Sequence, residues 1–388
     1  MTTESLLFSL LRFVICEEKI DNRIKSCCEP ERLEELYTLS KKHDLAHLAG
    51  YALEKLELPQ MEIFAKFKTA KMRAIYRYLQ YDQEAKRLYS VLEEARIPFI
   101  PLKGSVIRGY YPQPWMRTSC DIDILVPEQM LEQAATALTE KLGYVGKGKS
   151  DHDISMRSPK GIHLDLHYTA VDKERFPQAQ NVLGKIWQNA DKIKCDGFRR
   201  ELTDEMFYFY HIAHMAKHIE NGGCGIRPFL DLWILNHRIV FDCEKRKQLL
   251  REGNLLDFAL AAQKLSEIWF SQKETDSLSK KFESYVLRGG TYGIQENRVG
   301  VYQSKLGGRF GYARQRIFLP YNSLKYHYPI LQKYRFLMPV FEVVRWLKLL
   351  FKGGIKRSIH ELKVNAAVSD ETRDETQIML QYLGLEET

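Results

Sequence analysis

The sequence contains no apolar run that approaches the roughly 20 residues a helix needs to cross a bilayer. Its seven cysteines are an odd number, lie scattered along 388 residues and include no Cys-x-x-Cys pair. They therefore indicate neither a disulfide framework nor a zinc site. The apolar stretch near the N-terminus lacks a basic leader and is interrupted by Arg12, which is typical of an amphipathic helix rather than a secretory signal. These absences predict a globular protein of the reducing cytoplasm.

The chain also lacks internal repeats at the periods, roughly 20 to 50 residues, that mark solenoid proteins. Its length exceeds that of one compact core and indicates two or three domains. The formal net charge is +8, but it is unevenly distributed, because residues 301–363 contain 13 Lys and Arg against 2 Asp and Glu. The basic character therefore belongs to a C-terminal segment rather than to the whole chain.

Helix and strand signals divide the chain into four regions. Residues 1–96 show helical spacing of apolar residues and predict a helical N-terminal region. Residues 97–200 alternate strand and helix signals, residues 201–300 return mainly to helical spacing, and residues 301–388 form a basic aromatic region. No clear period appears within 271–310. The predicted fold class is α+β, with a small mixed-sheet domain at 97–200 between helical regions.

The stretch from Pro98 to Pro127 contains two features that point to nucleotide chemistry. Gly104-Ser105 follows a short apolar strand predicted at 97–102 and precedes a helix start, where backbone N–H groups attract phosphate. Asp121 and Asp123 lie two apart on the next predicted strand, so their side chains face the same side. Adjacent carboxylates repel each other unless a cation lies between them. Their oxygens, together with substrate phosphates, suit Mg²⁺.

A third carboxylate, Asp165, lies 42 residues after Asp123 in the second arm of a predicted β-hairpin around the turn 158–161. This spacing lets the strand of Asp165 pair beside the strand of Asp123, so that three carboxylates converge. Three carboxylates can hold two Mg²⁺ ions, which stabilise the attacking and leaving oxygens of a phosphoryl displacement. Solvated strand aspartates are the alternative, and they explain the pattern poorly because Asp is depleted in strands.

The order of strand, Gly-Ser, helix, Asp-x-Asp strand and third Asp strand resembles that of the DNA polymerase beta-like nucleotidyltransferase superfamily. One branch, the bacterial nucleotidyltransferase family proteins, is more similar. The similarity is specific over residues 97–168 and looser around 211–231. Two features depart from the smallest superfamily members: Cys120 intervenes between Ser119 and Asp121, and the spacing from Ser105 to Asp121 is longer. The matching motifs are Leu102-Lys103-Gly104, Tyr111-Pro112, Arg117, Asp121–Val126 and Asp165-Leu166-His167.

The resemblance implies a metal site. Asp121 and Asp123 would bind Mg²⁺, or Mn²⁺ in its place. Asp165 would bind the second metal and help to deprotonate an acceptor hydroxyl.

The resemblance also implies that Gly104 and Ser105 hold the β- and γ-phosphates of an NTP. Apart from the resemblance, we expect Lys103 and Arg117 beside the triphosphate, because cations there stabilise developing negative charge. Ordinary surface basicity is the alternative for both residues.

Histidines accompany the acids on two elements. His163 and His167 flank Asp165 on one strand face, which leaves a zinc site open. The preferred role for His167 is contact with substrate or support of a metal ligand, and an ordinary surface or core histidine is the alternative. A second set lies on a predicted helix and just beyond it. These residues are His211, His214, His218, Arg227 and Asp231. They are expected to line the acceptor side of the cleft. For Arg227 and Asp231, a buried ion pair between two helices is the alternative.

The segment 305–357 interleaves Arg and Lys with aromatic residues. It fits a solvated basic face over a small core, a surface for RNA or another polyanion, or a surface that rests on an anionic membrane or a partner. An amphipathic helix is predicted at 339–351.

The sequence therefore predicts a Mg²⁺-dependent nucleotidyltransferase that moves an NMP from an NTP to a hydroxyl and releases pyrophosphate. The acceptor is a small molecule, a peptide or protein, or an RNA end. Two alternatives remain open: a regulatory module that binds nucleotide without turnover, and a metal-dependent hydrolase that uses His163, Asp165 and His167.

Overall fold

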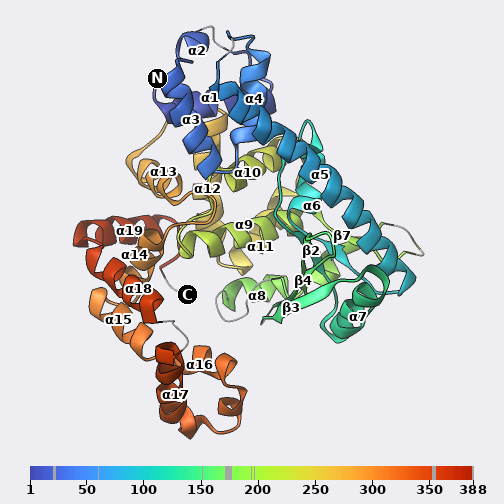
Figure 1. Ribbon diagram of the computed structural model, residues 1–388, viewed down its shortest axis with the longest axis vertical. Coiled ribbons are helices and arrows are strands. Elements are labelled where there is room, and N and C mark those ends of the chain that lie inside the picture. The colour runs from blue at the N-terminus through green and yellow to red at the C-terminus, as the bar shows by residue number, and fades with distance from the viewer. Residues whose placement is uncertain are drawn as a thin grey trace.

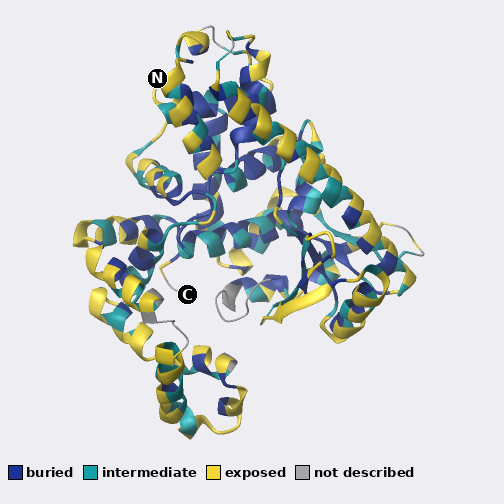
Figure 2. Cartoon of the chain, in the orientation of Figure 1, coloured by how far each residue is buried: buried dark blue, intermediate teal, exposed yellow. Residues whose placement is uncertain are grey.

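The computed structural model describes residues 1–20, 23–59, 61–150, 152–170, 177–193, 195, 197–351 and 355–386. The protein is an α+β structure in which helices surround one small mixed sheet (Figure 1). Buried residues concentrate where the N-terminal and central helices meet and around the sheet (Figure 2). In the chain as described, no helix is both long and apolar enough to cross a bilayer.

The helices before the sheet follow from the apolar spacing of the sequence. Leu6, Leu10 and Leu11 share one face of the first helix and are fully buried. The third helix begins at Pro30, a residue suited to the first helical position. The long fifth helix contains neither Gly nor Pro. The bounds are α1 Thr3–Ile15, α2 Arg23–Ser26, α3 Pro30–Lys42, α4 Ala46–Lys55 and α5 Ile63–Glu94.

The main sheet has the strand order β1-β2-β5-β4-β3. β2 runs parallel to β5, and the other neighbouring strands are antiparallel. The predicted hairpin is confirmed as β4 and β5, and the predicted pairing of the Asp165 strand with the Asp123 strand is confirmed as β5 beside β2. The bounds are β1 Ile100–Pro101, β2 Ile122–Leu125, β3 Val145–Lys149, β4 Asp153–Arg157 and β5 His163–His167.

One face of this sheet is covered by α5 and by α7 (Leu131–Leu142), which ends at Gly143 in the left-handed conformation that favours glycine. Ile124 and Leu166 point into the core beneath these helices. Because successive residues of a strand face opposite sides, this burial turns Asp123 and Asp165 toward the other face.

The helices after the sheet continue from residue 177. The mainly helical character predicted for residues 201–300 is confirmed by α9 to α13 and most of α14, and the amphipathic helix predicted at 339–351 is confirmed with a start one residue earlier. The remaining elements are α6 Gly104–Ile107, α8 Pro177–Leu183, β6 Ala190–Lys192, β7 Arg200–Leu202, α9 Asp204–Glu220, α10 Arg227–Arg238, α11 Cys243–Glu252, α12 Leu256–Phe270, α13 Ser277–Gly289, α14 Gln295–Lys305, α15 Arg309–Ile317, α16 Tyr321–His327, α17 Met338–Phe351, α18 Ile355–Ala367 and α19 Asp370–Tyr382. Short 3₁₀ turns also occur, among them one at Pro114–Met116.

Two segments differ from the sequence expectation. Residues 271–310 show no clear apolar period, yet the structure contains α13 and α14 in this range. Polar residues separate the buried positions of both helices, which explains why no period was recognised. The strand predicted at 97–102 shortens to β1, because Phe99 instead forms a bridge with Arg199. The largest core joins residues from Leu6 to Leu385 and crosses the four predicted regions, whose boundaries stay a prediction.

We expect Ile124→Ala to lower the free energy of unfolding by about 2–5 kcal/mol, because the truncation leaves a cavity beneath the sheet. Ile124 is fully buried, whereas Leu79 on α5 is 58% exposed. Urea unfolding followed by fluorescence measures the change, with Leu79→Ala as the matched control. Equal effects of the two substitutions would contradict this placement of the core.

Candidate active site

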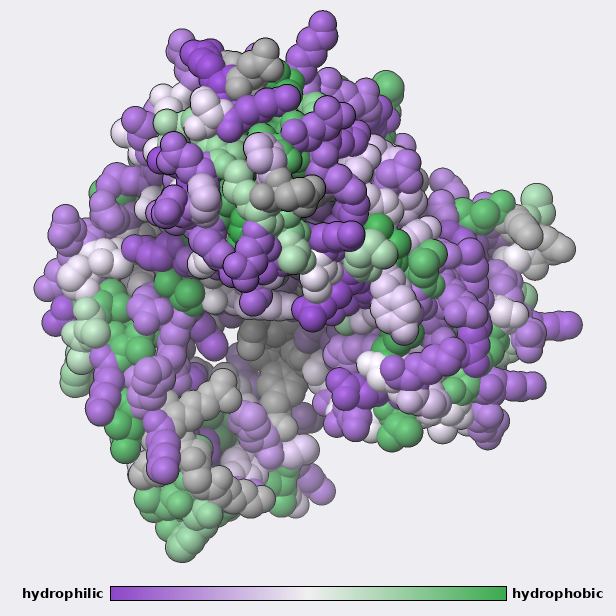
Figure 3. Space-filling model, turned by 45° about the horizontal axis from the view of Figure 1, so that its top comes forward, coloured by the Kyte–Doolittle hydropathy of each residue, from purple (hydrophilic) through white to green (hydrophobic). Residues whose placement is uncertain are grey.

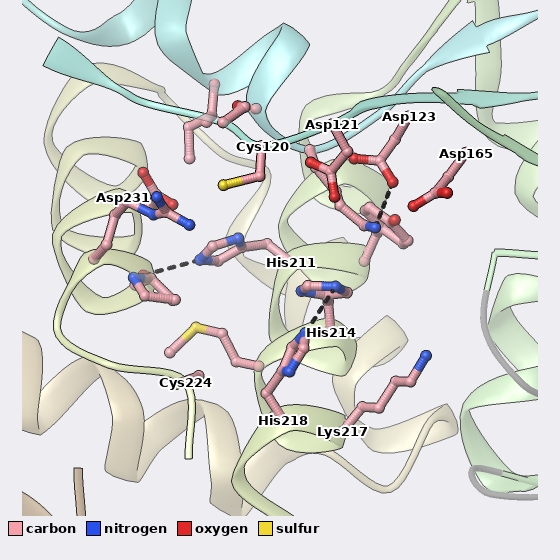
Figure 4. Close-up of a pocket in the computed structure, with 18 of the residues that line it drawn as sticks. Cys120, Asp121, Asp123, Asp165, His211, His214, Lys217, His218, Cys224 and Asp231 are labelled. Carbon is pink, nitrogen blue, oxygen red and sulfur yellow. Dashed lines mark hydrogen bonds and ion pairs between the residues drawn. The ribbon is translucent and has the colours of Figure 1, made fainter. Parts of the chain in front are cut away.

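A cavity of about 320 Å³ lies between the polar face of β2 and β5 and the helices α9 and α10 (Figure 4). It brings together the predicted site residues, with the exceptions of Ser105 and His163. The side chain of Ser105 interacts with Tyr89 instead. The predicted residues that line the cavity are Lys103, Gly104, Arg117, Asp121, Asp123, Asp165, His167, His211, His214, His218, Arg227 and Asp231.

The acidic wall of the cavity is centred on Asp123. β2 and β5 pair so that Asp123 lies directly opposite Asp165, and Asp121 precedes β2 on the same side (Figure 4). One oxygen of Asp123, Oδ1, accepts hydrogen bonds from Lys103 Nζ at 2.5 Å and from His167 Nε2 at 2.8 Å. Burial alone would raise the pKa of Asp123, but Lys103 and His167 outweigh it and hold that pKa well below its usual value.

The other two carboxylates lack comparable compensation. Burial, followed by the negative charge of Asp123, raises the pKa of Asp121 and also the pKa of Asp165. One lysine does not neutralise three neighbouring carboxylates, so a further positive charge would stabilise them. A divalent cation can supply that charge.

The donor atoms fit such a cation. Asp123, Asp165 and His167 each offer one ligand atom, and the three atoms lie within 4.8 Å of one another. Carboxylate oxygens suit Mg²⁺, and a mixed oxygen and imidazole set also suits Mn²⁺. His152 and Asp153, at the start of β4, form a second such group with His167, which the sequence reasoning did not anticipate.

His163 does not join either metal-binding group among the described residues. Its Nε2 lies 2.5 Å from the hydroxyl of Ser155 and 3.5 Å from Asp165 Oδ1. The arrangement therefore gives no support to a hydrolase site of His163, Asp165 and His167.

Lys103 has an unusual backbone conformation. It lies between β1 and α6 with φ 47° and ψ −123°, a region that glycine favours and that costs other residues about 1–3 kcal/mol. In this conformation the side-chain ammonium of Lys103 reaches Asp123. Burial would lower the pKa of Lys103, but the charge of Asp123 outweighs it and raises the pKa, so the lysine is positively charged.

Gly104 follows in a position where no side chain fits. A Cβ there would lie 2.0 Å from Ser119 Oγ. Arg108 fastens this contact, since its Nε donates to the Gly104 carbonyl at 2.7 Å and its Nη2 donates to Ser119 Oγ at 3.1 Å. The backbone at Gly104 is therefore held close to the segment that leads to Asp121.

Arg117 forms a buried ion pair with Asp231 of α10. Its Nε donates to both carboxylate oxygens, at 2.7 and 2.9 Å, and Tyr111 donates its hydroxyl to the same group at 2.6 Å. The expectation of an Arg227–Asp231 pair is wrong, because Arg227 pairs with Asp44 instead. Sequence proximity favoured the wrong partner, whereas the observed partner lies 114 residues away.

The opposite wall comes from α9, whose histidines face the acids across the cavity (Figure 4). His211 Nε2 pairs with the carbonyl of Pro228 at 3.0 Å. The Nε2 atoms of His214 and His218 lie 3.2 Å apart. Burial, followed by the charge of Lys103, lowers the pKa of His218 to about 4. Burial, followed by the charge of His218, lowers the pKa of His214 well below its usual value. Both rings are therefore neutral at pH 7.

Tyr210 and Lys217 also line the cavity, although the sequence did not mark them as candidates. They lie four residues before and three residues after the predicted His214 on α9, so helical periodicity was the signal that could have found them. The Tyr210 hydroxyl is buried without a hydrogen-bond partner among the described residues. That hydroxyl is available to a ligand.

Residues 29–271 match a protein family described as an uncharacterised nucleotidyltransferase. The chain belongs to this nucleotidyltransferase family. It is accordingly a transferase of the class that moves nucleoside monophosphate groups. The matched range contains the whole acidic wall and the α9–α10 wall of the cavity.

No curated protein matches the nucleotidyltransferase chain significantly. Among solved structures, the solution structure of the antibiotic-resistance factor ANT(2'')-Ia is similar at 14% identity, over 53% of this chain and 91% of that chain, with a TM-score of 0.24. Similarity at this level supports no argument about the site.

The histidine wall of the nucleotidyltransferase predicts a pH effect on stability. His218 has a pKa of about 4 in the folded chain and about 6.5 when unfolded, so the unfolded chain takes up the proton first. Stability from neutral His218 is therefore present above pH 6.5 and is lost as the pH falls toward 4. With His218→Gln, we expect this loss to shrink by about 2 kcal/mol, allowing for solvent in the cavity.

Urea midpoints measured at a series of pH values test this expectation. His327→Gln changes an exposed histidine of α16 and serves as the control, which should follow the wild type. An unchanged pH dependence of the His218→Gln variant would show that this ring does not stay neutral in the folded chain.

Proposed function

We propose that the protein is a divalent-metal-dependent nucleotidyltransferase, with Mg²⁺ as the metal, that transfers an NMP from an NTP to a hydroxyl acceptor. The observation that carries the proposal is the pairing of Asp123 with Asp165 on adjacent parallel strands, beside Asp121, in a cavity of a chain that belongs to a nucleotidyltransferase family. In the reaction, the acceptor oxygen forms a bond to the α-phosphorus, the bond to the bridging oxygen breaks, and pyrophosphate leaves.

Asp121, Asp123 and Asp165 would hold the metal, with His167 as a further ligand or as a support of Asp123. When bound, the cation neutralises charge on the triphosphate and makes the α-phosphorus more open to attack. Asp165 would accept the proton of the acceptor hydroxyl. It lies at the edge of the acidic wall, where an acceptor hydroxyl could reach it.

Lys103 and Gly104 would bind the triphosphate. With a metal held by Asp123, the ammonium of Lys103 would be free to contact a phosphate oxygen. Gly104 lines the cavity next to Lys103, so its backbone would lie beside the phosphates. Arg117 is a weaker candidate for direct phosphate contact, since Asp231 already compensates its charge.

The acceptor would enter along the α9–α10 wall, beside His211, His218 and Arg227. Arg227 donates to Asp44 and to the hydroxyl of Thr118, while its Nε is buried without a partner among the described residues. Neutral imidazoles and a single guanidinium suit an acceptor that offers hydroxyl groups.

We expect the double variant Asp121→Ala/Asp123→Ala to lose on the order of 10³-fold or more in NMP transfer, because the metal loses its ligands. Labelled NTPs, Mg²⁺ and a cell extract as the source of acceptors provide the assay, read as label incorporation and pyrophosphate release. Glu132→Ala removes an exposed carboxylate of α7 and should leave transfer unchanged. Labelling by the double variant at the wild-type rate would refute the proposal.

Lys103→Met keeps the length of the side chain and removes its charge. We expect Mn²⁺ to bind this variant about tenfold more tightly when no nucleotide is present, because the ammonium no longer competes for Asp123. NTP affinity should fall by a similar factor. Titration calorimetry measures both constants, and Lys86→Met, which changes an exposed helix lysine, is the control. Unchanged Mn²⁺ affinity would mean that Lys103 does not occupy the cation's position.

A further inference from the structure

An uncovered apolar stripe runs along α17, which lies away from the cavity-lining helices α9 and α10 (Figure 1). Val340, Val343, Leu347, Leu350 and Phe351 are 47–85% exposed. Their spacing of three, four, three and one residues places them within an arc of about 100° on the helix surface. Five large apolar side chains in a row on one exposed helix face are more than scattered surface residues would give.

The opposite face of α17 is already occupied. Phe341 and Val344 pack against a small core of Leu324, Tyr328 and Leu331. The buried carboxylate of Glu342 accepts the backbone N–H of Leu319 at 2.6 Å. The helix is therefore fixed by its inner face, and the part of the chain that the structure describes leaves the outer stripe uncovered.

Residues 318–351, a unit that contains α16 and α17, carry further exposed aromatic side chains. Phe318, just before α16, and Phe336, just before α17, are both exposed. This unit projects from the lower end of the molecule (Figure 1), and hydrophobic residues gather on that end in the space-filling view (Figure 3).

Positive charge predominates in the segment that contains the stripe. The only acids in 301–363, Glu342 and Glu361, are both paired with arginines, Arg345 and Arg316. Their negative charge is therefore neutralised within this segment. Exposed cations remain, since Lys333, Arg335 and Lys348 are exposed and lie over neighbouring tyrosine rings.

The combination of an exposed aliphatic stripe with a basic segment identifies the chemistry of the partner. RNA would be contacted by aromatic stacking and cations, and it offers nothing for Val343, Leu347 or Leu350 to pack against. An anionic bilayer satisfies both features, because the aliphatic face enters the boundary of headgroups and acyl chains while Lys and Arg meet the lipid phosphates. We propose that the α17 stripe docks the protein on the surface of an anionic phospholipid bilayer.

Vesicle sedimentation with the full chain tests this proposal. The vesicles contain phosphatidylcholine alone or phosphatidylcholine mixed with phosphatidylglycerol. Wild-type protein should sediment with the mixed vesicles, should bind the neutral ones more weakly by on the order of tenfold, and should be released as ionic strength rises. Equal binding to both vesicles, or binding to neither, overturns the proposal.

Leu347→Glu should lower binding to the mixed vesicles by on the order of tenfold or more, because a carboxylate replaces an inserted apolar side chain. Leu260→Glu makes the same change at a similarly exposed position of α12, and it should bind as the wild type does. Both variants should melt at the wild-type temperature. If Leu347→Glu destabilises the chain, Val343→Ser provides the same test with a smaller change.

Two further measurements separate other occupants of the stripe. Light scattering reports whether the chain dimerises, and a dimer that Leu347→Glu dissociates, without vesicle binding by the wild type, assigns the stripe to a second copy. Retention on an RNA column, unaffected by Leu347→Glu and without vesicle binding, assigns the segment to a polyanion. Either result rejects the membrane proposal, and neither depends on nucleotidyl transfer.

Discussion

The parallel pairing of β2 with β5 is the constraint on which the site depends. It places Asp123 directly opposite Asp165, so two carboxylates meet in a partly buried cavity. A slip of one residue in this pairing would turn the acids into the core and the isoleucines outward. The buried faces of Ile122, Ile124, Leu164 and Leu166 hold the register against the repulsion between the acids. The favourable packing beneath the sheet thus offsets the repulsion between the carboxylates above it, as is common where a core supports a functional site.

Charges around the acids are balanced by partners from distant parts of the chain. Lys103 and His167 share one oxygen of Asp123, Arg117 neutralises Asp231, and Arg227 pairs with Asp44. Removing one partner of a buried pair typically costs about 3–5 kcal/mol, because the other charge is left uncompensated. These pairs therefore define the walls of the cavity as firmly as apolar packing does.

The sequence was sufficient for those parts of the site that depend on local periodicity. Alternation in 163–167 and in 121–126 predicted which residues face together, and the hairpin turn predicted that β5 could reach β2. It was insufficient where the partner is set by tertiary packing, as for Arg117 with Asp231 and Arg227 with Asp44. The backbone of Lys103 was equally hidden, since nothing in a lysine signals a conformation that glycine prefers. α13 and α14 were missed because polar or small residues fill part of their buried faces, Ser279 and Gly289 on α13 and Asn297 and Gln303 on α14.

The buried pairs that join the walls have a consequence for how ligands can be sought. Arg117 and Asp231 connect the segment before β2 to α10, and Thr118 and Arg227 both bond to Asp44 between α3 and α4. A hinge between these walls would expose several unpaired charges at once. The cavity is thus expected to keep its dimensions when it fills, so rigid-body docking of hydroxyl-bearing compounds and fragment soaking are suited to finding the acceptor.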